Sequence, residues 1–197
     1  MSGPEAELKS VSDRVHWQEY PADVIEIAAL RGRSREIEAI AGARGIALPG
    51  FGRAVPTDRW ISLSVRPERW LILLAPTASG ARVAQWQAAC SGAGAAVDVS
   101  SAWSVLQLSG PMGRELLSRS CRVDLSEGAA PVGRAIATVM AQVGVIIVTT
   151  SSGPLVLTQS TMARHFREWL ALSAHSAGLV PQSGRGAPAL PRSSGPS

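Results

Sequence analysis

The residues that could do acid–base, nucleophilic or metal chemistry are few in this sequence and lie far apart. The three histidines, His16, His165 and His175, have no second histidine, cysteine or aspartate at metal-ligand spacing. The two cysteines, Cys90 and Cys121, form no CxxC or Cys/His pattern, so neither a disulfide framework nor a zinc site is indicated. We therefore predict no catalytic, cofactor-binding or metal-binding residue in this chain.

Two weaker signals have structural interpretations that we favour. Cys121 has Arg119 and Arg122 as neighbours, and arginines can lower the pKa of a thiol, but a small buried residue at a helix end is the simpler interpretation. Asp124 follows Arg122 in an expected loop, where a turn or a structural ion pair is favoured. The glycines of 91–94 come at the expected end of a helix, where the dipole repels phosphate.

Composition indicates a globular protein that binds neither nucleic acid nor membrane. The chain has 197 residues, 46% hydrophobic and 17% charged, and a net charge of +4. Its arginines are scattered and aromatic residues for base stacking are scarce, which disfavours nucleic acid. The longest apolar runs, 70–75 and 143–148, are far shorter than the roughly 20 residues of a membrane span. Residues 1–22 contain no apolar signal core, so we expect a cytoplasmic protein.

Hydrophobic periodicity predicts strand–helix–strand–strand–helix–strand, first clearly and then again with an altered end. In the first half, strands are expected at 24–30, 60–65, 70–75 and 95–99, with helices over 34–44 and around Val83, Trp86 and Cys90. In the second half, strands are expected at 103–108, 134–141, 143–150 and 155–158, with a helix ending near Arg119 and another carrying Met162, Phe166, Trp169 and Leu170.

This order predicts an α+β fold of two tandem split βαβ (ferredoxin-like) units packed as one body. The expected boundaries are an extended N-terminal arm at 1–22, a first unit at 23–100, a second at 101–178, and a flexible tail at 179–197 that is rich in Pro, Gly and Ser. Trp17 is the one tryptophan outside the expected elements, so we interpret it as an anchor that inserts into a partner.

Several short segments together resemble one known family over about residues 55–172. They are Pro67–Leu73, Leu108-Ser109-Gly110-Pro111, Ser120–Leu125, Pro131-Val132-Gly133, Gln142–Val145, Ser160–Phe166 and Trp169-Leu170. The combination is similar to the gamma subunit of heterotetrameric sarcosine oxidase and its relatives, which include N-methylglutamate dehydrogenase.

The resemblance implies the fold of the folate-binding aminomethyltransferase of the glycine cleavage system (T-protein). It also implies a non-catalytic accessory subunit that docks mainly on the large alpha subunit, beside beta and delta subunits. The complex oxidatively demethylates a secondary amine, and its FAD, FMN, NAD, tetrahydrofolate and zinc belong to the other subunits.

Two hypotheses about function follow. In the first, the chain is an interaction protein, and its partner-contact residues are Trp17, Arg119, Arg122, Asp124 and His165. In the second, it is a free-standing folate-binding or one-carbon transfer protein, which needs a carboxylate to hold the pterin in an enclosed pocket. Asp98 is the one candidate near a strand end.

Overall fold

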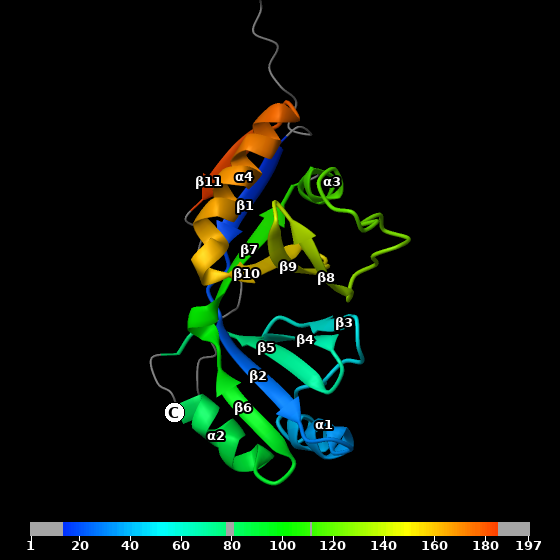
Figure 1. Cartoon of the computed structure of the whole chain (residues 1–197), viewed down its shortest axis with the longest axis vertical. Coiled ribbons are helices and arrows are strands. Elements are labelled where there is room, and N and C mark those ends of the chain that lie inside the picture. Colours follow the sequence, from blue (N-terminus) through cyan, green and yellow to red (C-terminus); the bar gives the residue numbers. More distant parts are fainter. Residues whose placement is uncertain (1–13, 78–80, 111, 185–197) are drawn as a thin grey trace, which may run out of the picture.

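The computed structural model describes residues 14–77, 81–110 and 112–184, which form two β-sheets with helices on one face of each (Figure 1). The first sheet has five strands in the order β3-β4-β5-β2-β6. Its elements are β2 (Asp23–Ala29), α1 (Ser34–Gly42), β3 (Arg53–Pro56), β4 (Trp60–Arg66), β5 (Arg69–Leu74), α2 (Ala81–Cys90) and β6 (Gly94–Asp98).

The first sheet confirms the split βαβ prediction. Strand β5 lies between β2 and β4 and is antiparallel to both, so β2 and β4 run parallel to each other. The sequence analysis missed β3, because Pro49, Gly50, Gly52 and Pro56 are typical of a linker. The strand is short and occupies the sheet edge, where a proline is tolerated.

The second sheet has six strands in the order β11-β1-β7-β10-β9-β8. Its elements are β1 (Arg14–Glu19), β7 (Trp103–Ser109), α3 (Gly113–Ser118), β8 (Ala135–Met140), β9 (Val143–Val148), β10 (Leu155–Gln159), α4 (Ala163–Ser176) and β11 (Val180–Gly184), with short 3-10 turns at Ser100–Ala102 and Ser160–Met162. Here β10 separates β9 from β7, just as β5 separates β4 from β2 in the first sheet. The second half therefore repeats the first, with β1 as one additional strand between β7 and β11.

The N-terminal arm expected at 1–22 needs correction. Residues 14–19 are extended, but they form β1 inside the second sheet, antiparallel to β7 and parallel to β11. Val15 and Trp17 alternate with His16 and Gln18, and the first pair is 0% and 6% exposed. Trp17 is therefore part of this chain's own core and is not free to anchor in a partner. Residues 1–13 lie outside the described part of the chain.

The tail expected at 179–197 is corrected in its first residues. Leu179 is buried, and Val180–Gly184 form β11 beside β1, so these residues complete the second sheet. Residues 185–197 lie outside the described part of the chain.

Three apolar cores divide the molecule into four layers, helices–sheet–sheet–helices (Figure 1). The first sheet packs against α1 and α2, and the second packs against α3 and α4. Between the sheets lies a shared core that contains Leu63 and Leu73 from the first sheet and Val148 and Leu157 from the second, all 0% exposed. No helix in the described ranges is long and apolar enough to cross a membrane.

Backbone hydrogen bonds join the sheets directly at one edge. The Ala54 N–H donates to the Gly133 carbonyl at 2.9 Å, and the Ala135 N–H donates to the Gly52 carbonyl at 3.1 Å. Gly133 has φ +87°, and a Cβ atom there would lie 3.1 Å from the Ala54 oxygen. A glycine at this position therefore permits the close approach of β3 and β8.

We predict that Trp17→Ala lowers the free energy of unfolding by about 3–5 kcal/mol, because it leaves a cavity beneath α4. Denaturant titration of the full chain measures the change. The matched control is Phe51→Ala, which truncates an aromatic side chain that is 68% exposed and should change stability by about 0.5 kcal/mol or less. Equally small effects of both variants would contradict the burial of Trp17 in solution.

Candidate partner-binding surfaces

The histidines remain isolated in the structure. His16 lies half-buried on β1, and His165 and His175 are exposed on α4. Across residues 14–77, 81–110 and 112–184, no three His, Cys, Asp or Glu side chains gather closely enough to hold a metal ion. The His165 Nε2 atom lies 3.3 Å from the Ala141 carbonyl, which connects the start of α4 to the β8–β9 turn.

The two cysteines are unbridged and occupy packing positions. Cys90, the last residue of α2, is buried in the core between the first sheet and its helices, and burial raises the pKa of its thiol, although Arg44 opposes this. Cys121 is half-buried, with its Sγ atom 3.9 Å from the Thr138 hydroxyl. The Val123 N–H also donates to this sulfur at 3.4 Å. These contacts favour the packing interpretation of Cys121 over a reactive thiol.

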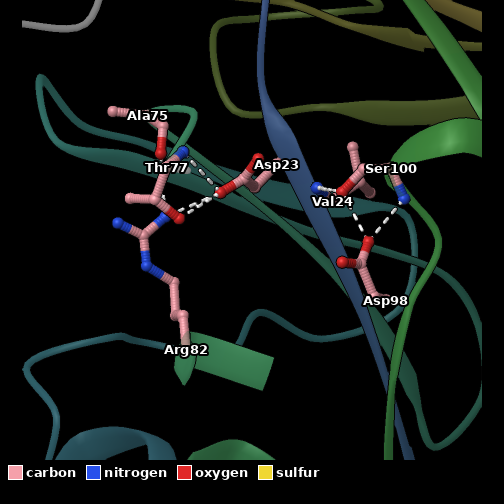
Figure 2. Close-up of polar contacts among 7 residues, drawn as sticks. All are labelled: Asp23, Val24, Ala75, Thr77, Arg82, Asp98 and Ser100. Atoms are coloured by element: carbon pink, nitrogen blue, oxygen red, sulfur yellow. Dashed lines mark hydrogen bonds and ion pairs between the residues drawn. The ribbon is translucent and has the colours of Figure 1, made fainter. Parts of the chain in front are cut away.

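Asp23 ties the start of β2 to the connection that follows β5 (Figure 2). Thr77 donates to Asp23 Oδ2 from its backbone N–H at 2.9 Å and from its hydroxyl at 2.8 Å. Arg82 lies 3.4 Å from the same oxygen and also donates to the Ala75 carbonyl at 2.8 Å. Asp23 is thus satisfied by structural partners.

Asp98 is likewise occupied within the fold (Figure 2). Its Oδ1 atom accepts hydrogen bonds from the Ser100 N–H at 2.9 Å and the Ser100 hydroxyl at 2.6 Å, and these bonds lower the pKa of Asp98. The Ser100 hydroxyl oxygen accepts in turn from the Val24 N–H at 2.9 Å. The group fixes the turn that leads from β6 in the first sheet to β7 in the second.

The loop after α3 carries three of the expected partner-contact residues on an anchored backbone. Arg114 donates from one Nη to the carbonyls of Leu125 at 2.7 Å and Ala130 at 3.0 Å, which fixes the loop against α3. Arg119 pairs with Glu115 at 3.1 Å, with both side chains about half exposed. Arg122 is exposed and forms none of the ion pairs found among the described residues.

Asp124 acts as a turn residue in the same loop. It is exposed, and its Oδ1 atom accepts from the Ser126 N–H at 2.8 Å, a hydrogen bond that lowers the pKa of the carboxyl. The structural ion pair with Arg122 that the sequence suggested is absent from the described contacts, and the turn interpretation fits.

A shallow hollow connects this loop to α4. Its lining consists of Arg119, Ser120, Trp169, Leu172, Ser173, Ser176 and Ala177. Leu172 is 67% exposed, whereas the helix residues Phe166 and Leu170 are fully buried. The structure therefore brings Arg119 to the outer face of α4, while His165 lies nearer the other end of that helix. Trp17 is beneath the helix in the core.

The sequence analysis missed the exposed apolar side chains as candidates for partner contact. They are Leu30, Phe51, Val97, Val132, Val139, Met162 and Leu172. Met162 was expected in the buried stripe of the last helix, yet it is 36% exposed because it precedes the first turn of α4. Periodicity could place Val97 on a strand but could not show which part of the sheet face stays uncovered.

A pocket of about 190 Å³ opens at one end of the seam between the sheets. Its lining consists of Tyr20, Pro56, Thr57, Asp58, Ile61, Gln107, Val132, Thr150, Ser151, Ser152 and Leu155. Tyr20 is 7% exposed, and burial raises the pKa of its phenol to about 12. The Gln107 amide donates to the Ser152 hydroxyl at 3.0 Å. These polar groups form no acid–base pair with one another.

A family model for the gamma subunit of sarcosine oxidase matches residues 37–177. The chain belongs to the sarcosine oxidase gamma subunit family. The anticipated resemblance is thereby confirmed, and with it the role of an accessory subunit. Among curated protein sequences, none matches.

Two solved structures share the fold. A chain of heterotetrameric sarcosine oxidase from Corynebacterium sp. U-96 superposes with a TM-score of 0.75 and 24% identity, covering 86% of this chain and 88% of that one. Aminomethyltransferase T of the glycine cleavage system from Bartonella henselae gives 0.59 and 14% identity, covering 86% of this chain and 53% of that one. The chain therefore spans about half of the aminomethyltransferase. Its α+β fold resembles that part of the aminomethyltransferase.

We predict that the sole tyrosine, Tyr20, titrates near pH 12 in the folded chain, two units above an exposed phenol. The unfolded chain ionises near pH 10, so ionisation favours unfolding and stability falls as pH rises from about 10 to about 12. Phenolate absorbance measures the titration, and urea unfolding measures the stability. Tyr20→Phe is the control, since it removes both signals. An ordinary titration near pH 10 in folded protein would contradict the burial.

Proposed function

We propose that this chain is the non-catalytic gamma-type subunit of a heterotetrameric sarcosine oxidase-like flavoenzyme. The match of the family model over residues 37–177 carries the proposal. The dispersed histidines and the structurally occupied Asp23 and Asp98 support it, because a catalytic centre needs a nucleophile or base with partners. The working part of such a subunit is its outer surface.

The proposed complex oxidatively demethylates a secondary amine in the cytoplasm. Its alpha, beta and delta subunits would hold FAD, FMN, NAD, tetrahydrofolate and zinc, and this chain would dock mainly on alpha. The similar chain from Corynebacterium sp. U-96 belongs to a heterotetrameric sarcosine oxidase, which supports assembly with other chains.

We propose the loop after α3 and the outer face of α4 as one contact surface, with Arg119, Arg122, Asp124 and His165 as its polar residues. Their exposure and the anchored loop backbone support this, since a fixed surface loses less entropy on binding than a mobile one. Leu172 supplies an apolar centre beside Arg119. An exposed leucine within a polar rim is typical of a partner interface.

A free-standing folate-binding or one-carbon transfer protein is the second candidate, favoured by the likeness to aminomethyltransferase T. Asp98 is the carboxylate that this function would use. Its Oδ1 atom is held by Ser100, and the side chain is exposed rather than enclosed. A pterin site needs an enclosed pocket, so this geometry favours the accessory role.

The proposed function predicts that the tagged full-length chain, co-expressed with the products of its neighbouring genes, co-purifies with flavin-containing chains. Arg122→Ala should weaken this assembly while the melting temperature of the isolated chain stays within a few degrees, because an exposed side chain contributes about 0.5 kcal/mol or less to stability. Recovery of the wild-type chain alone, as a monomer, would exclude the accessory role.

The two candidates differ in their response to tetrahydrofolate. Calorimetric titration of the isolated full-length chain should give no measurable heat of binding, because the proposed complex holds folate on other subunits. Tight binding that Asp98→Asn abolishes would instead favour the one-carbon transfer function. Glu38→Gln, which changes an exposed carboxylate on α1 away from the pocket between the sheets, is the matched control.

A further inference from the structure

The inner face of the first sheet is only half covered by the second sheet. The register places three rows of side chains on this face, running across β4, β5, β2 and β6. The first row contains Ile61, Leu73 and Val24, which are buried in the core between the sheets. The second sheet covers this row completely.

The second sheet covers the next two rows only in part. In the second row, Leu63 and Leu71 are buried, but Val97 on the edge strand β6 is 51% exposed. In the third row, Arg69 and Ala95 are exposed and the remaining side chains, Val65 and Ala28, are half-buried. This open end of the sheet face continues the shared apolar core through Val65, and its residues on the edge strand β6, Ala95 and Val97, are exposed.

The open face is not purely apolar, because an ion pair crosses it. Arg69 approaches Glu26 at 2.8 Å, with 52% and 30% of the two side chains exposed. A hollow beside this pair is lined by Glu26, Leu63, Val65, Arg66, Arg69, Trp70 and Leu71. A small apolar area with a central Arg–Glu pair can bind a protein surface but offers little to a small molecule.

Five exposed arginines lie in or next to the β4–β5 turn and the loop before α1. Glu68, in the β4–β5 turn, accepts from the Gly32 N–H at 3.4 Å and from the Ser34 hydroxyl at 3.0 Å, and the Ala29 N–H donates to its carbonyl at 2.9 Å. These bonds hold the turn against the loop before α1. The exposed arginines of this loop, of the first turn of α1 and of the adjoining ends of β4 and β5 are Arg31, Arg33, Arg35, Arg66 and Arg69.

The acidic side chains at this end are already engaged. Glu26 pairs with Arg69, Glu36 pairs with Arg33 at 2.7 Å, and Glu68 is taken up by the loop before α1. Arg31, Arg35 and Arg66 form no ion pair with any described residue. Leu30, 56% exposed, lies in the same loop as Arg31. The rim of the open face is therefore positive.

We propose that the open end of the first sheet's inner face, with its rim of Arg31, Arg35 and Arg66, docks an acidic surface of a companion subunit. An apolar segment of that subunit covers Val97, Ala95 and Ala28, and its carboxylates meet the three arginines. This inference rests on the proposed function and adds a second contact surface, separate from the loop after α3. Arginine suits this role because its planar group binds carboxylates through two parallel hydrogen bonds.

Charge reversal at the rim tests the proposal in the co-expressed complex. Arg66→Glu should lower the amount of companion protein retained by the tagged chain by about tenfold, since a reversed charge repels the acidic partner surface. Arg59→Glu is the matched control: it reverses an exposed arginine next to the opposite end of β4, about 23 Å away at the usual rise per strand residue. It should change retention by less than about twofold.

A second variant pair tests the apolar part of the surface. Val97→Asp places a charge on the open face and should lower retention by about tenfold, because the carboxylate would be buried on docking. Ala88→Asp introduces the same charge at an exposed alanine on α2, which covers the other face of the sheet, and should leave retention unchanged. Retention of the wild type should also weaken with rising salt, and less so for Arg66→Glu.

The outcomes separate this proposal from the proposed function. If the wild type assembles and both Arg66→Glu and Val97→Asp assemble equally well, the docking surface is wrong and the accessory role stands. If the wild-type chain emerges alone, both fall. If Arg66→Glu leaves assembly intact but abolishes salt-dependent retention of the isolated chain on nucleic acid, the arginines serve a nucleic-acid partner and the proposal is overturned.

Discussion

Most of this fold depends on the burial of the inner faces of the two sheets against each other. Each sheet has one face covered by its own helices. The opposite, apolar faces are removed from water by packing against each other. The chain enters the second sheet as β1, crosses at Tyr20 into the first, and returns through the turn at Ser100–Ala102. The Tyr20 N–H donates to the Val105 carbonyl at 2.9 Å at this crossing. Neither half can therefore be removed without exposing the inner core of the other.

The parts of the fold that could be predicted are those in which neighbouring residues carry the signal. The first sheet follows from runs such as 70–75 and from helices with apolar residues at 3.6-residue spacing. Strands β1 and β11 could not be predicted in this way, because they pair with each other across almost the whole chain and β1 pairs otherwise only with β7. Trp17 was misread for the same reason: its alternation with Val15 is a strand signal only once β7 and β11 lie beside it.

The surface residues were predicted less well than the elements that carry them. Arg119, Arg122, Asp124 and His165 are exposed, as a contact role requires. The open face around Val97 depends on how far one sheet extends beyond the other, which is a property of packing and not of local pattern. One carboxylate shows the converse. From the sequence, Asp98 was the one candidate carboxylate for a pterin site, and in the fold it fixes the turn between β6 and β7.

The parallel pairing of β1 with β11 has a consequence for how the protein is made. These strands come from nearly opposite ends of the chain, with Arg14 opposite Val180. During synthesis, the core beneath α1 and α2 draws only on residues between Ile25 and Ala96, so it can form while the ribosome is still extending the chain. The second sheet must wait for its last strand, and such long-range pairing is slow. Until β11 has been synthesised, the free side of β1 is an unpaired strand edge that other chains or chaperones can contact first.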